Sequence, residues 1–267
     1  MSPAPFLSDL QAIEYVKRDQ IAYITLNRPQ VMNALNQATI LELTAAFEDA
    51  RENNDVRGVI LTGAGGKAFA AGADISELAK ATPTDAEEQA RRGQHLTLLI
   101  ETLGKPVIAA VNGLALGGGC ELAMACSLRL ATEEARFGQP EIKLGLIPGF
   151  GGTQRLARLI GKAQATQLIL TGENLTAADA YRLGMINEIV PGEQLLTRAE
   201  EILRKISNNA PLAVRYALQA ITEGLNQSVR AGMNLESALF AVCASTDDMR
   251  EGTAAFLEKR HPVFNGR

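Results

Sequence analysis

Two glutamates stand in glycine-rich surroundings that suit acid–base chemistry. Glu121 follows a run of three glycines at residues 117–119, and Glu141 follows Pro140 and precedes a second glycine cluster at residues 149–152. Each is flanked by apolar residues, and glutamate is rarely buried unless it is paired or used. A carboxyl group held in this way has a raised pKa and exchanges protons near neutral pH. The pattern predicts an acid–base site; the alternative is two surface glutamates at helix starts, where acids suit the helix dipole.

A second glycine-rich stretch, residues 63–75, indicates backbone that lies close to a ligand. It reads GAGGKAFAAGADI. It is not a P-loop, because Leu61 stands where that motif needs its first glycine and Ala68 stands where it needs Ser or Thr. Its glycines and small alanines suit close approach of the backbone to a bound molecule. A tight surface loop without a ligand is the alternative.

Strands and helices alternate over the first half of the chain and must position these residues. Apolar runs and alternation predict strands at residues 13–16, 21–27, 56–62, 106–111 and 128–131, the first two forming a hairpin. Helical spacing predicts helices at residues 37–51, 85–103 and 119–126, with Asn36 capping the first. This alternation is typical of an α/β core with crossover connections.

The chain becomes mostly helical after Thr153. Short helices are expected at 163–170 and 177–183, the second capped by Thr176, with a last short strand at 188–190. Longer amphipathic helices are expected at 193–206, 211–223, 229–246 and 248–259. The apolar stripe on each of them fits either a cap on the same subunit or a subunit interface.

Composition limits the classes of partner and compartment. The 267 residues carry a net charge of −4 and are 46% hydrophobic, which is ordinary for a globular chain and gives no sign of nucleic-acid or membrane binding. The N-terminus shows no signal peptide pattern, and no apolar run reaches eighteen residues. The three cysteines, Cys120, Cys126 and Cys243, lack metal or redox spacing. We therefore expect a cytoplasmic protein with reduced, buried thiols.

Several other site types are disfavoured by the sequence. The two histidines, His95 and His261, lie far apart in the chain, so no metal cluster is expected. No GxSxG motif of a serine hydrolase occurs. A dinucleotide-binding GxGxxG fails at Gly149, because Gln154 occupies the last glycine position.

Several blocks of the sequence resemble the enoyl-CoA hydratase (crotonase) family. These blocks are NGLALGGGCELAMAC from residue 112, FGQPEIKLGLIPGFGGTQRL from 137, LNRPQVMNALN from 26, KAFAAGADI from 67 and EGTAAFLEKRHPVF from 251. They follow the family's order and span nearly the whole chain. The resemblance implies the crotonase fold, a superhelix of repeated β-β-α turns. Residues 1–200 would form the core with the active site, and residues 201–267 a helical oligomerisation region.

The resemblance also implies reversible addition of water to a trans-2-enoyl-CoA, with a short chain such as crotonyl-CoA preferred. Glu121 matches the residue that holds and activates the water, and Glu141 the one that gives a proton to the α carbon, although the division between them is open. The backbone N–H groups of Ala73 and Gly118 match the donors to the thioester oxygen. Coenzyme A is part of the substrate, and no other cofactor and no metal are implied.

Positions that match the family's substrate contacts extend along the chain. They are Arg28, Ala71, Asp74, Ile75, Gly149, Phe256 and Lys259. Many relatives carry lysine where Gln30 and Ser76 stand here, which leaves Arg28 and Lys259 for the CoA phosphates, with solvated surface charges as the alternative. A homotrimer, or a hexamer of two trimers, is the expected assembly.

Rival functions differ at identifiable residues. An isomerase of the same fold usually has an acid at the Glu141 position and none at the Glu121 position, so the presence of both favours hydration. Dehalogenases of the family need a histidine, and none falls between residues 112 and 152. Some relatives bind RNA, but the net charge of −4 and the lack of a dense Lys/Arg patch argue against it here. The sequence leaves the preferred acyl chain length undetermined.

Overall fold

Six strands form the larger sheet, in the order β1-β2-β3-β5-β7-β10. The computed structural model describes Leu7 and residues 9–267; residues 1–6 and 8, on which the expectation of no signal peptide partly depends, lie outside the described residues. The strands are β1 Ile13–Arg18, β2 Ile21–Leu26, β3 Gly58–Gly63, β5 Val107–Val111, β7 Leu128–Ala131 and β10 Glu188–Ile189. β1 and β2 form the expected hairpin, and the neighbours from β2 onward are parallel.

A second, smaller sheet was not expected from the sequence. Its strands are β4 Ala68–Ala70, β6 Leu114–Leu116, β8 Arg136–Gly138 and β9 Asn174–Thr176, and β4, β6 and β8 are parallel. Three of them directly follow a strand of the first sheet along the chain: β3 leads to β4, β5 to β6 and β7 to β8, whereas β9 follows α6. Each of these turns of the chain therefore adds one strand to the larger sheet and one to the smaller sheet, and a helix follows. This arrangement confirms the β-β-α superhelix.

Helices cover the sheets and extend beyond them. They are α1 Gln37–Glu52, α2 Ile75–Leu78, α3 Pro83–Glu101, α4 Gly118–Ala125, α5 Gly152–Ile160, α6 Lys162–Thr171, α7 Ala177–Arg182, α8 Leu195–Ser207, α9 Pro211–Gly224, α10 Val229–Ala244 and α11 Asp247–Glu258, with 3-10 turns η1 Pro29–Val31, η2 Pro140–Leu144 and η3 Gly192–Gln194. The caps at Asn36 and Thr176 are confirmed, each accepting a backbone N–H of the first turn. The sequence did not predict α2 or α5.

Side-chain alternation along the parallel strands fills two cores. Val59, Leu61, Val107 and Ala109 point toward α1, α3 and α4, within one large buried cluster. The residues between them in the chain, Ile60, Ile108 and Ala110, pack on Leu195, Ala199 and Leu203 of α8. Helices thus cover both faces of the sheet, as parallel strands require. The expected boundary at residue 200 falls inside α8, which packs on the sheet; the division into two regions stays a prediction.

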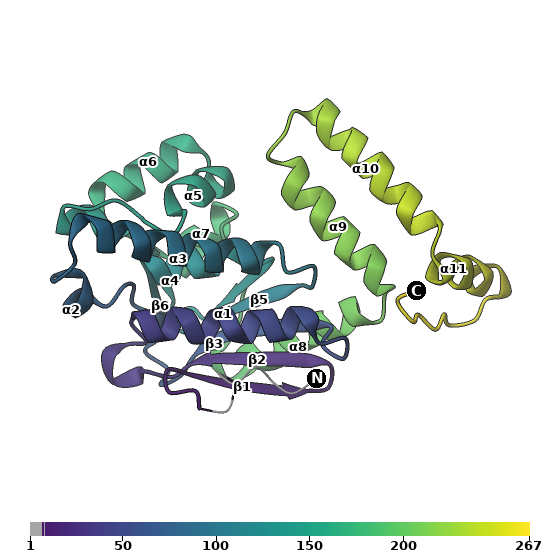
Figure 1. Ribbon diagram of the computed structural model, residues 1–267, viewed down its shortest axis with the longest axis horizontal. Helices are drawn as coiled ribbons and strands as arrows, with labels where there is room; N and C mark the ends of the chain where they lie inside the picture. The colour runs from purple at the N-terminus through teal and green to yellow at the C-terminus, as the bar shows by residue number, and fades with distance from the viewer. Residues whose placement is uncertain (1–6, 8) are drawn as a thin grey trace.

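The C-terminal arm, residues 208–267, extends away from the sheets (Figure 1). Its helices α9 and α10 pack on each other, and neither contains a buried residue. The last residues turn back, so that the Arg267 carbonyl accepts the Asp247 N–H at the start of α11 at 2.7 Å. Across the described residues, no helix is both long enough and apolar enough to cross a membrane.

Candidate active site

α4 places Glu121 in the interior of the molecule. Every residue of this helix is buried, and Glu121 is 1% exposed. The helix begins so close to β4 that a Cβ at Gly119 would lie 2.1 Å from the Ala70 carbonyl oxygen. Only glycine fits there, which explains the glycine run that precedes the glutamate. The alternative of a surface glutamate at a helix start does not describe Glu121.

Two backbone N–H groups from a separate segment hold the Glu121 carboxylate. Its Oε1 atom accepts the Phe150 N–H at 2.8 Å and the Gly152 N–H at 2.6 Å. Burial raises the pKa of Glu121 to about 7, the Gly152 N–H opposes that rise, and the charge of Glu141 adds to it. A carboxyl group with such a pKa gains and loses a proton near neutral pH.

Glu141 reaches the same region from η2. Burial raises the pKa of Glu141, although the residue as a whole is half-buried. Its Oε2 atom is buried and has no hydrogen-bond partner among the described residues. Its Oε1 atom lies so near α4 that a Cβ at Gly117 would be 2.8 Å from it. One carboxyl is therefore held by two donors while the other keeps a free oxygen, and the two lie within electrostatic reach.

The two backbone N–H groups expected to bind a thioester oxygen are free and adjacent. Gly72, with φ +101°, passes within van der Waals distance of Gly117, since a Cβ on Gly117 would be 3.6 Å from Gly72 Cα. Ala73 and Gly118 are the next residues of these two segments. Within the described part of the chain, neither of their N–H groups makes a hydrogen bond. Gly118 also opens α4, so the positive end of that helix faces the same place.

An aromatic side chain forms the apolar wall beside these donors. The ring of Phe150 lies between α4 and α3, because a Cβ at Gly118 would be 3.2 Å from it and one at Gly93 only 2.1 Å. Leu35 closes the other side, with its Cδ1 atom 3.2 Å from the same Gly118 position. An acyl chain at this place would meet carbon on both sides.

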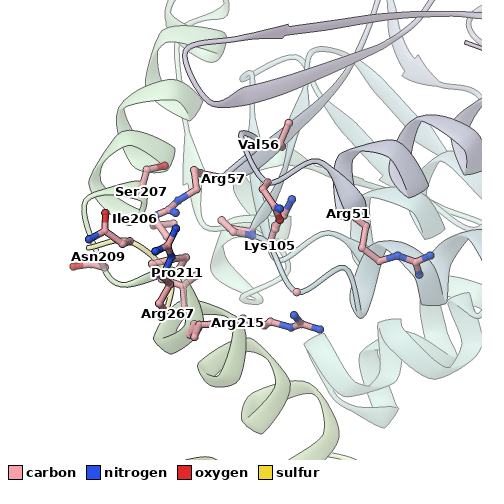
Figure 2. Close-up of a pocket in the computed structure, with 17 residues that line it drawn as sticks. Arg51, Val56, Arg57, Lys105, Ile206, Ser207, Asn209, Pro211, Arg215 and Arg267 are labelled. Carbon is pink, nitrogen blue, oxygen red and sulfur yellow. The ribbon is translucent and has the colours of Figure 1, made fainter. Parts of the chain in front are cut away.

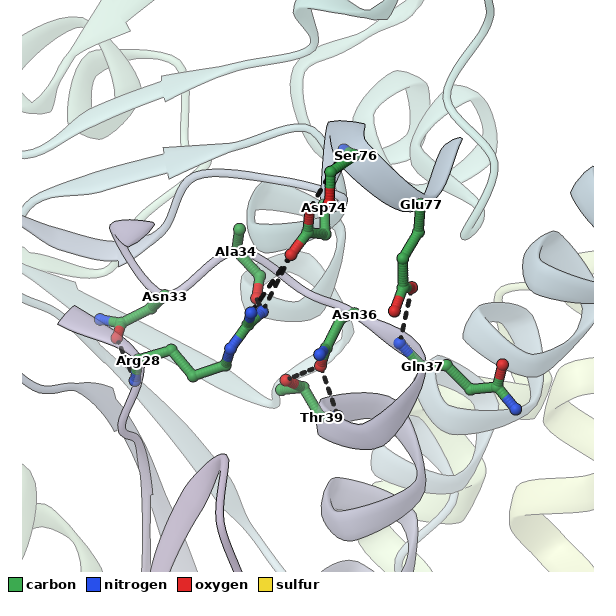
Figure 3. Close-up of polar contacts among 9 residues, drawn as sticks. All are labelled: Arg28, Asn33, Ala34, Asn36, Gln37, Thr39, Asp74, Ser76 and Glu77. Carbon is green, nitrogen blue, oxygen red and sulfur yellow. Dashed lines mark hydrogen bonds and ion pairs between the residues drawn. The ribbon is translucent and has the colours of Figure 1, made fainter. Parts of the chain in front are cut away.

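The residues expected near CoA at the first loops do come together (Figure 3). The Arg28 guanidinium donates to Asp74 at 3.2 Å and to the Ala34 carbonyl at 2.6 Å, and it is largely buried. The Ser76 hydroxyl, more than the arginine, holds the pKa of Asp74 below its usual range. Arg28 is therefore neither a solvated surface charge nor a free cation, and its contact with a CoA phosphate stays a prediction.

Some of the remaining residues expected to contact the substrate lie in the core, and the others lie at the end of α11. Ala71 N–H donates to the Met32 carbonyl at 3.0 Å, and Ile75 is exposed at the start of α2. The Gly149 carbonyl accepts Gln94 Nε2 at 2.9 Å, next to the donors that hold Glu121. By contrast, Phe256 and Lys259 lie exposed at the end of α11, on the opposite side of the molecule from α2 (Figure 1).

Two supporting residues were missed by sequence reasoning. Gln139 is fully buried, and its Oε1 atom lies beside Gly152, where a Cβ would be 2.8 Å from it and 2.9 Å from Glu121 Oε1. Arg155 donates to the Phe150 carbonyl at 3.0 Å and pairs with Glu101 at 2.8 Å, which fixes the segment that holds Glu121. The position of Gln139, two residues before Glu141, was the available signal.

No metal centre accompanies these groups in the described residues, where no three His, Cys, Asp or Glu side chains are arranged to hold an ion. Cys120 and Cys126 are buried free thiols, whereas Cys243 is half-buried. The groups gathered at this place are two carboxyl groups and oriented backbone N–H donors.

Comparison with known proteins shows that the chain is similar to enoyl-CoA hydratases. A family model described as "Enoyl-CoA hydratase/isomerase" matches residues 17–267. The "Short-chain-enoyl-CoA hydratase" of Clostridium acetobutylicum is 45% identical over 94% of this chain and 97% of its own, and the "Crotonyl-CoA hydratase" of Syntrophomonas wolfei is 45% identical over 93% and 95%. A crystal structure of an enoyl-CoA hydratase from Bacillus anthracis superposes with a TM-score of 0.93 and 41% identity, covering 96% of this chain and all of the other.

Proposed function

The chain belongs to the enoyl-CoA hydratase/isomerase family and has enoyl-CoA hydratase function, and we propose that it adds water reversibly to short trans-2-enoyl-CoA thioesters such as crotonyl-CoA. The product is the corresponding 3-hydroxyacyl-CoA, and the pathway is fatty acid β-oxidation or related acyl-CoA metabolism. The names of the Clostridium and Syntrophomonas relatives support the short-chain substrate. The observation that carries the proposal is the pair of carboxyl groups, Glu121 buried and Glu141 half-buried, both with raised pKa, beside two free backbone N–H groups.

In the proposed reaction, the ionised Glu121 removes a proton from a bound water as the water oxygen bonds to C3 of the substrate. The C2=C3 double bond shifts to give an enolate, and protonated Glu141 then delivers its proton to C2. The raised pKa of both groups suits this exchange, because each must hold a proton in one half of the cycle. Net, one water is added, and a proton passed between the two glutamates restores them.

The enolate oxygen is placed between Ala73 N–H and Gly118 N–H. Removing one such donor costs about 3–4 kcal/mol of transition-state stabilisation in enzymes that use them. The positive end of α4 adds to the same effect. Neither donor needs to break a protein hydrogen bond to bind the oxygen, since both are free in the described structure.

The CoA part of the substrate is proposed to lie along Arg28, Ala71, Asp74 and Ile75, with Gly149 near the water. Phe256 and Lys259 lie at the end of α11, which Figure 1 shows on the opposite side of the molecule from α2. We assign them to the CoA of a neighbouring subunit in a homotrimer or homohexamer. The protein would work in the cytoplasm with no metal or further cofactor, and without nucleic acid or membrane.

A direct assay tests the reaction. Purified protein should hydrate crotonyl-CoA, seen as loss of the conjugated thioester absorbance, without added metal or redox cofactor. Inhibition by EDTA, or no turnover of any enoyl-CoA, would refute the proposal. Rates with four-, eight- and twelve-carbon enoyl-CoAs decide the preferred chain length. A salt-dependent RNA shift would instead indicate the RNA-binding function.

Isomerisation of the double bond is the alternative within the same fold. It needs one acid to move a proton between carbons and has no use for a second carboxylate that activates water. The two N–H donors on Glu121 Oε1 favour hydration, because they fix an ionised carboxylate in place for a water. Incubation with a 3-enoyl-CoA distinguishes the two: formation of the 2-enoyl isomer faster than hydration would favour the isomerase.

A further inference from the structure

A cavity of about 450 Å³ lies between the core and the C-terminal arm (Figure 2), and neither Glu121 nor Glu141 lines it. Its inner wall comes from the loop after α1 and the turn before β5. Its outer wall comes from the start of α9 and the last residues of the chain. The cationic residues that line it are Arg51, Arg57, Lys105, Arg215 and Arg267, and no acidic side chain lines it.

The arginines of this cavity are not neutralised by carboxylates. Among the described residues, Arg57, Arg215 and Arg267 form no ion pair through their side chains. Arginines elsewhere do pair, as Arg260 does with Glu251 at 2.6 Å. The chain carries a net charge of −4, so this local excess of positive charge is a feature of the cavity and not of the whole protein.

Lys105 shows the effect of this charge. Its ammonium group donates to the Ala50 and Asn53 carbonyls at 2.7 and 2.6 Å, at the end of α1. Burial, with the positive charges of Arg57 and Arg215, lowers the pKa of Lys105 to about 8, against the opposing charge of Asp49. After burial, the charges of Arg57 and Arg215 also disfavour the protonated amine, so these arginines lie within electrostatic reach of Lys105.

The cations come from two bodies of the fold. Arg57 and Lys105 belong to the core, whereas Arg215 and Arg267 belong to the C-terminal arm, and the Arg215 side chain lies over Gly104, about 3.3 Å from the position of its Cβ. On the outer wall, the Arg267 carbonyl oxygen accepts the Asp247 N–H at the start of α11. Like charges on the two walls repel each other across the gap, and a bound anion would remove that repulsion.

We propose that this cavity binds a small anion carrying two or more phosphate-type charges, and that the anion joins the C-terminal arm to the core. Its size falls within the range of small-molecule sites, and arginine is the residue best suited to phosphate. The positive groups line a recess and do not form a stripe along the surface, which favours a small ligand over a nucleic acid. The site is separate from the proposed catalytic site.

Calorimetric titration of the full-length protein with pyrophosphate tests the proposal. One site per chain is expected, and the midpoint of thermal unfolding should rise with pyrophosphate, because a ligand that binds the folded state stabilises it. The double variant Arg57→Gln/Arg215→Gln should bind at least about 10-fold more weakly, since each charged hydrogen bond lost costs about that factor. The matched control, Arg91→Gln/Arg182→Gln, removes the same charge at exposed sites on α3 and α7 and should bind as the parent does.

No saturable binding up to about 10 mM pyrophosphate, or equal weakening in the control, overturns the proposal. ADP in place of pyrophosphate identifies the source: tighter binding of ADP indicates a nucleotide, and equal binding an inorganic oligophosphate. Circular dichroism checks that the double variant is folded; if it is not, Arg57→Gln alone replaces it. The Glu121→Gln protein should bind pyrophosphate normally, so this result does not depend on the proposed reaction.

Discussion

At the scale of single residues, the two glutamates differ in what surrounds their oxygens. Glu121 is almost fully buried and still receives two N–H donors, so its ionised form is disfavoured by burial and favoured by hydrogen bonds at once. Glu141 has one buried oxygen without a donor, which leaves burial as the main influence on its pKa. The two environments fit the different parts that we propose for these side chains in one proton exchange.

Replacing either glutamate by glutamine should reduce kcat by about 10²–10⁴, because glutamine keeps the shape but transfers no proton at neutral pH. The double variant should be little worse than the worse single one, as expected for groups that act as a unit. Steady-state rates with crotonyl-CoA check this. Binding of a CoA thioester should survive in all three variants. Near-normal hydration by Glu121→Gln would contradict the assignment and favour the isomerase.

The stability of the protein should depend on the proton of Glu121. Its folded pKa of about 7 lies above its ordinary value of 4.5, so the folded state holds this proton longer than the unfolded state does. Stability therefore falls as pH rises from about 4.5 to 7, by about 3 kcal/mol for a shift of this size, and the full cost remains above pH 7. Glu121→Gln should lack this loss. Urea unfolding of both proteins, at the same protein concentration, gives their free energies of unfolding between pH 4.5 and 7.5. A difference between the two free energies that does not change with pH would contradict the prediction.

The sequence predicted these two residues better than their supports. Glu121 and Glu141 can be recognised in the sequence, because a glutamate among apolar residues and a run of glycines are both unusual. The donors to Glu121 are the backbone N–H groups of Phe150 and Gly152. Every residue except proline has such a group, so the residue types do not reveal these donors. Gln139 and Arg155 depend on contacts across the fold, which no local pattern reveals.

At the scale of elements, the site depends on how α3, α4 and α5 meet. The N-terminus of α5 points at Glu121 on α4, and the Phe150 ring just before α5 fills the space left by Gly93 in the middle of α3. A glycine in a helix interior normally weakens that helix by about 1 kcal/mol relative to alanine. Here it makes room for the ring whose segment holds the carboxylate.

Gly93→Ala should therefore lower stability by about 1–3 kcal/mol, the reverse of the usual helix effect, because its Cβ would meet the Phe150 ring at 2.1 Å. The ring and its segment must move, so kcat should fall as well. Denaturant unfolding and crotonyl-CoA rates measure both. Gly224→Ala is the control, since the nearest atom to its Cβ position, apart from its chain neighbours and the near backbone of its own helix, is Gly232 Cα at 3.8 Å. Equal effects of the two substitutions would contradict the packing argument.

The helices and the longer strands were predictable because each shows its period over many residues. The second sheet was not, because strands of three residues, such as Ala68–Ala70, are too short to show alternation. Glu141 lies directly after Pro140 on a 3-10 turn, and no pattern in the sequence predicted that turn. What positions the second glutamate is thus tertiary pairing between short strands.

At the scale of the whole molecule, the C-terminal arm is incomplete by itself. Helices α9 and α10 bury no residue, yet Ile221, Leu225, Val229, Met233 and Phe240 are exposed along them. Helix propensity alone rarely stabilises a helix of this length, and apolar side chains on such an element mark an interface. A second copy of the chain is the occupant that the proposed trimer supplies.

Met233→Glu/Phe240→Glu should convert the assembly to monomers, because two charges would enter an apolar contact. Both side chains are more than 60% exposed in the single chain, at 62% and 76%, so the isolated fold should tolerate the change. Sedimentation velocity measures the state. Asn234→Glu, on the same helix and also exposed, is the control and should leave the assembly intact. A parent protein that is itself a stable, active monomer would refute the oligomer.

The assembly also explains how Phe256 and Lys259 could contact CoA, and subunit mixing tests it. Lys259→Glu should raise KM, because a negative charge would face the CoA phosphates, whereas Glu121→Gln should lower the kcat of its own chain by about 10²–10⁴. In mixed oligomers of the two variants, a chain with an intact Glu121 can receive Lys259 from its neighbour. If the lysine acts across the interface, part of the activity should recover the KM of the parent protein. If it acts within its own chain, or not at all, mixing should leave KM equal to that of the Lys259→Glu protein alone.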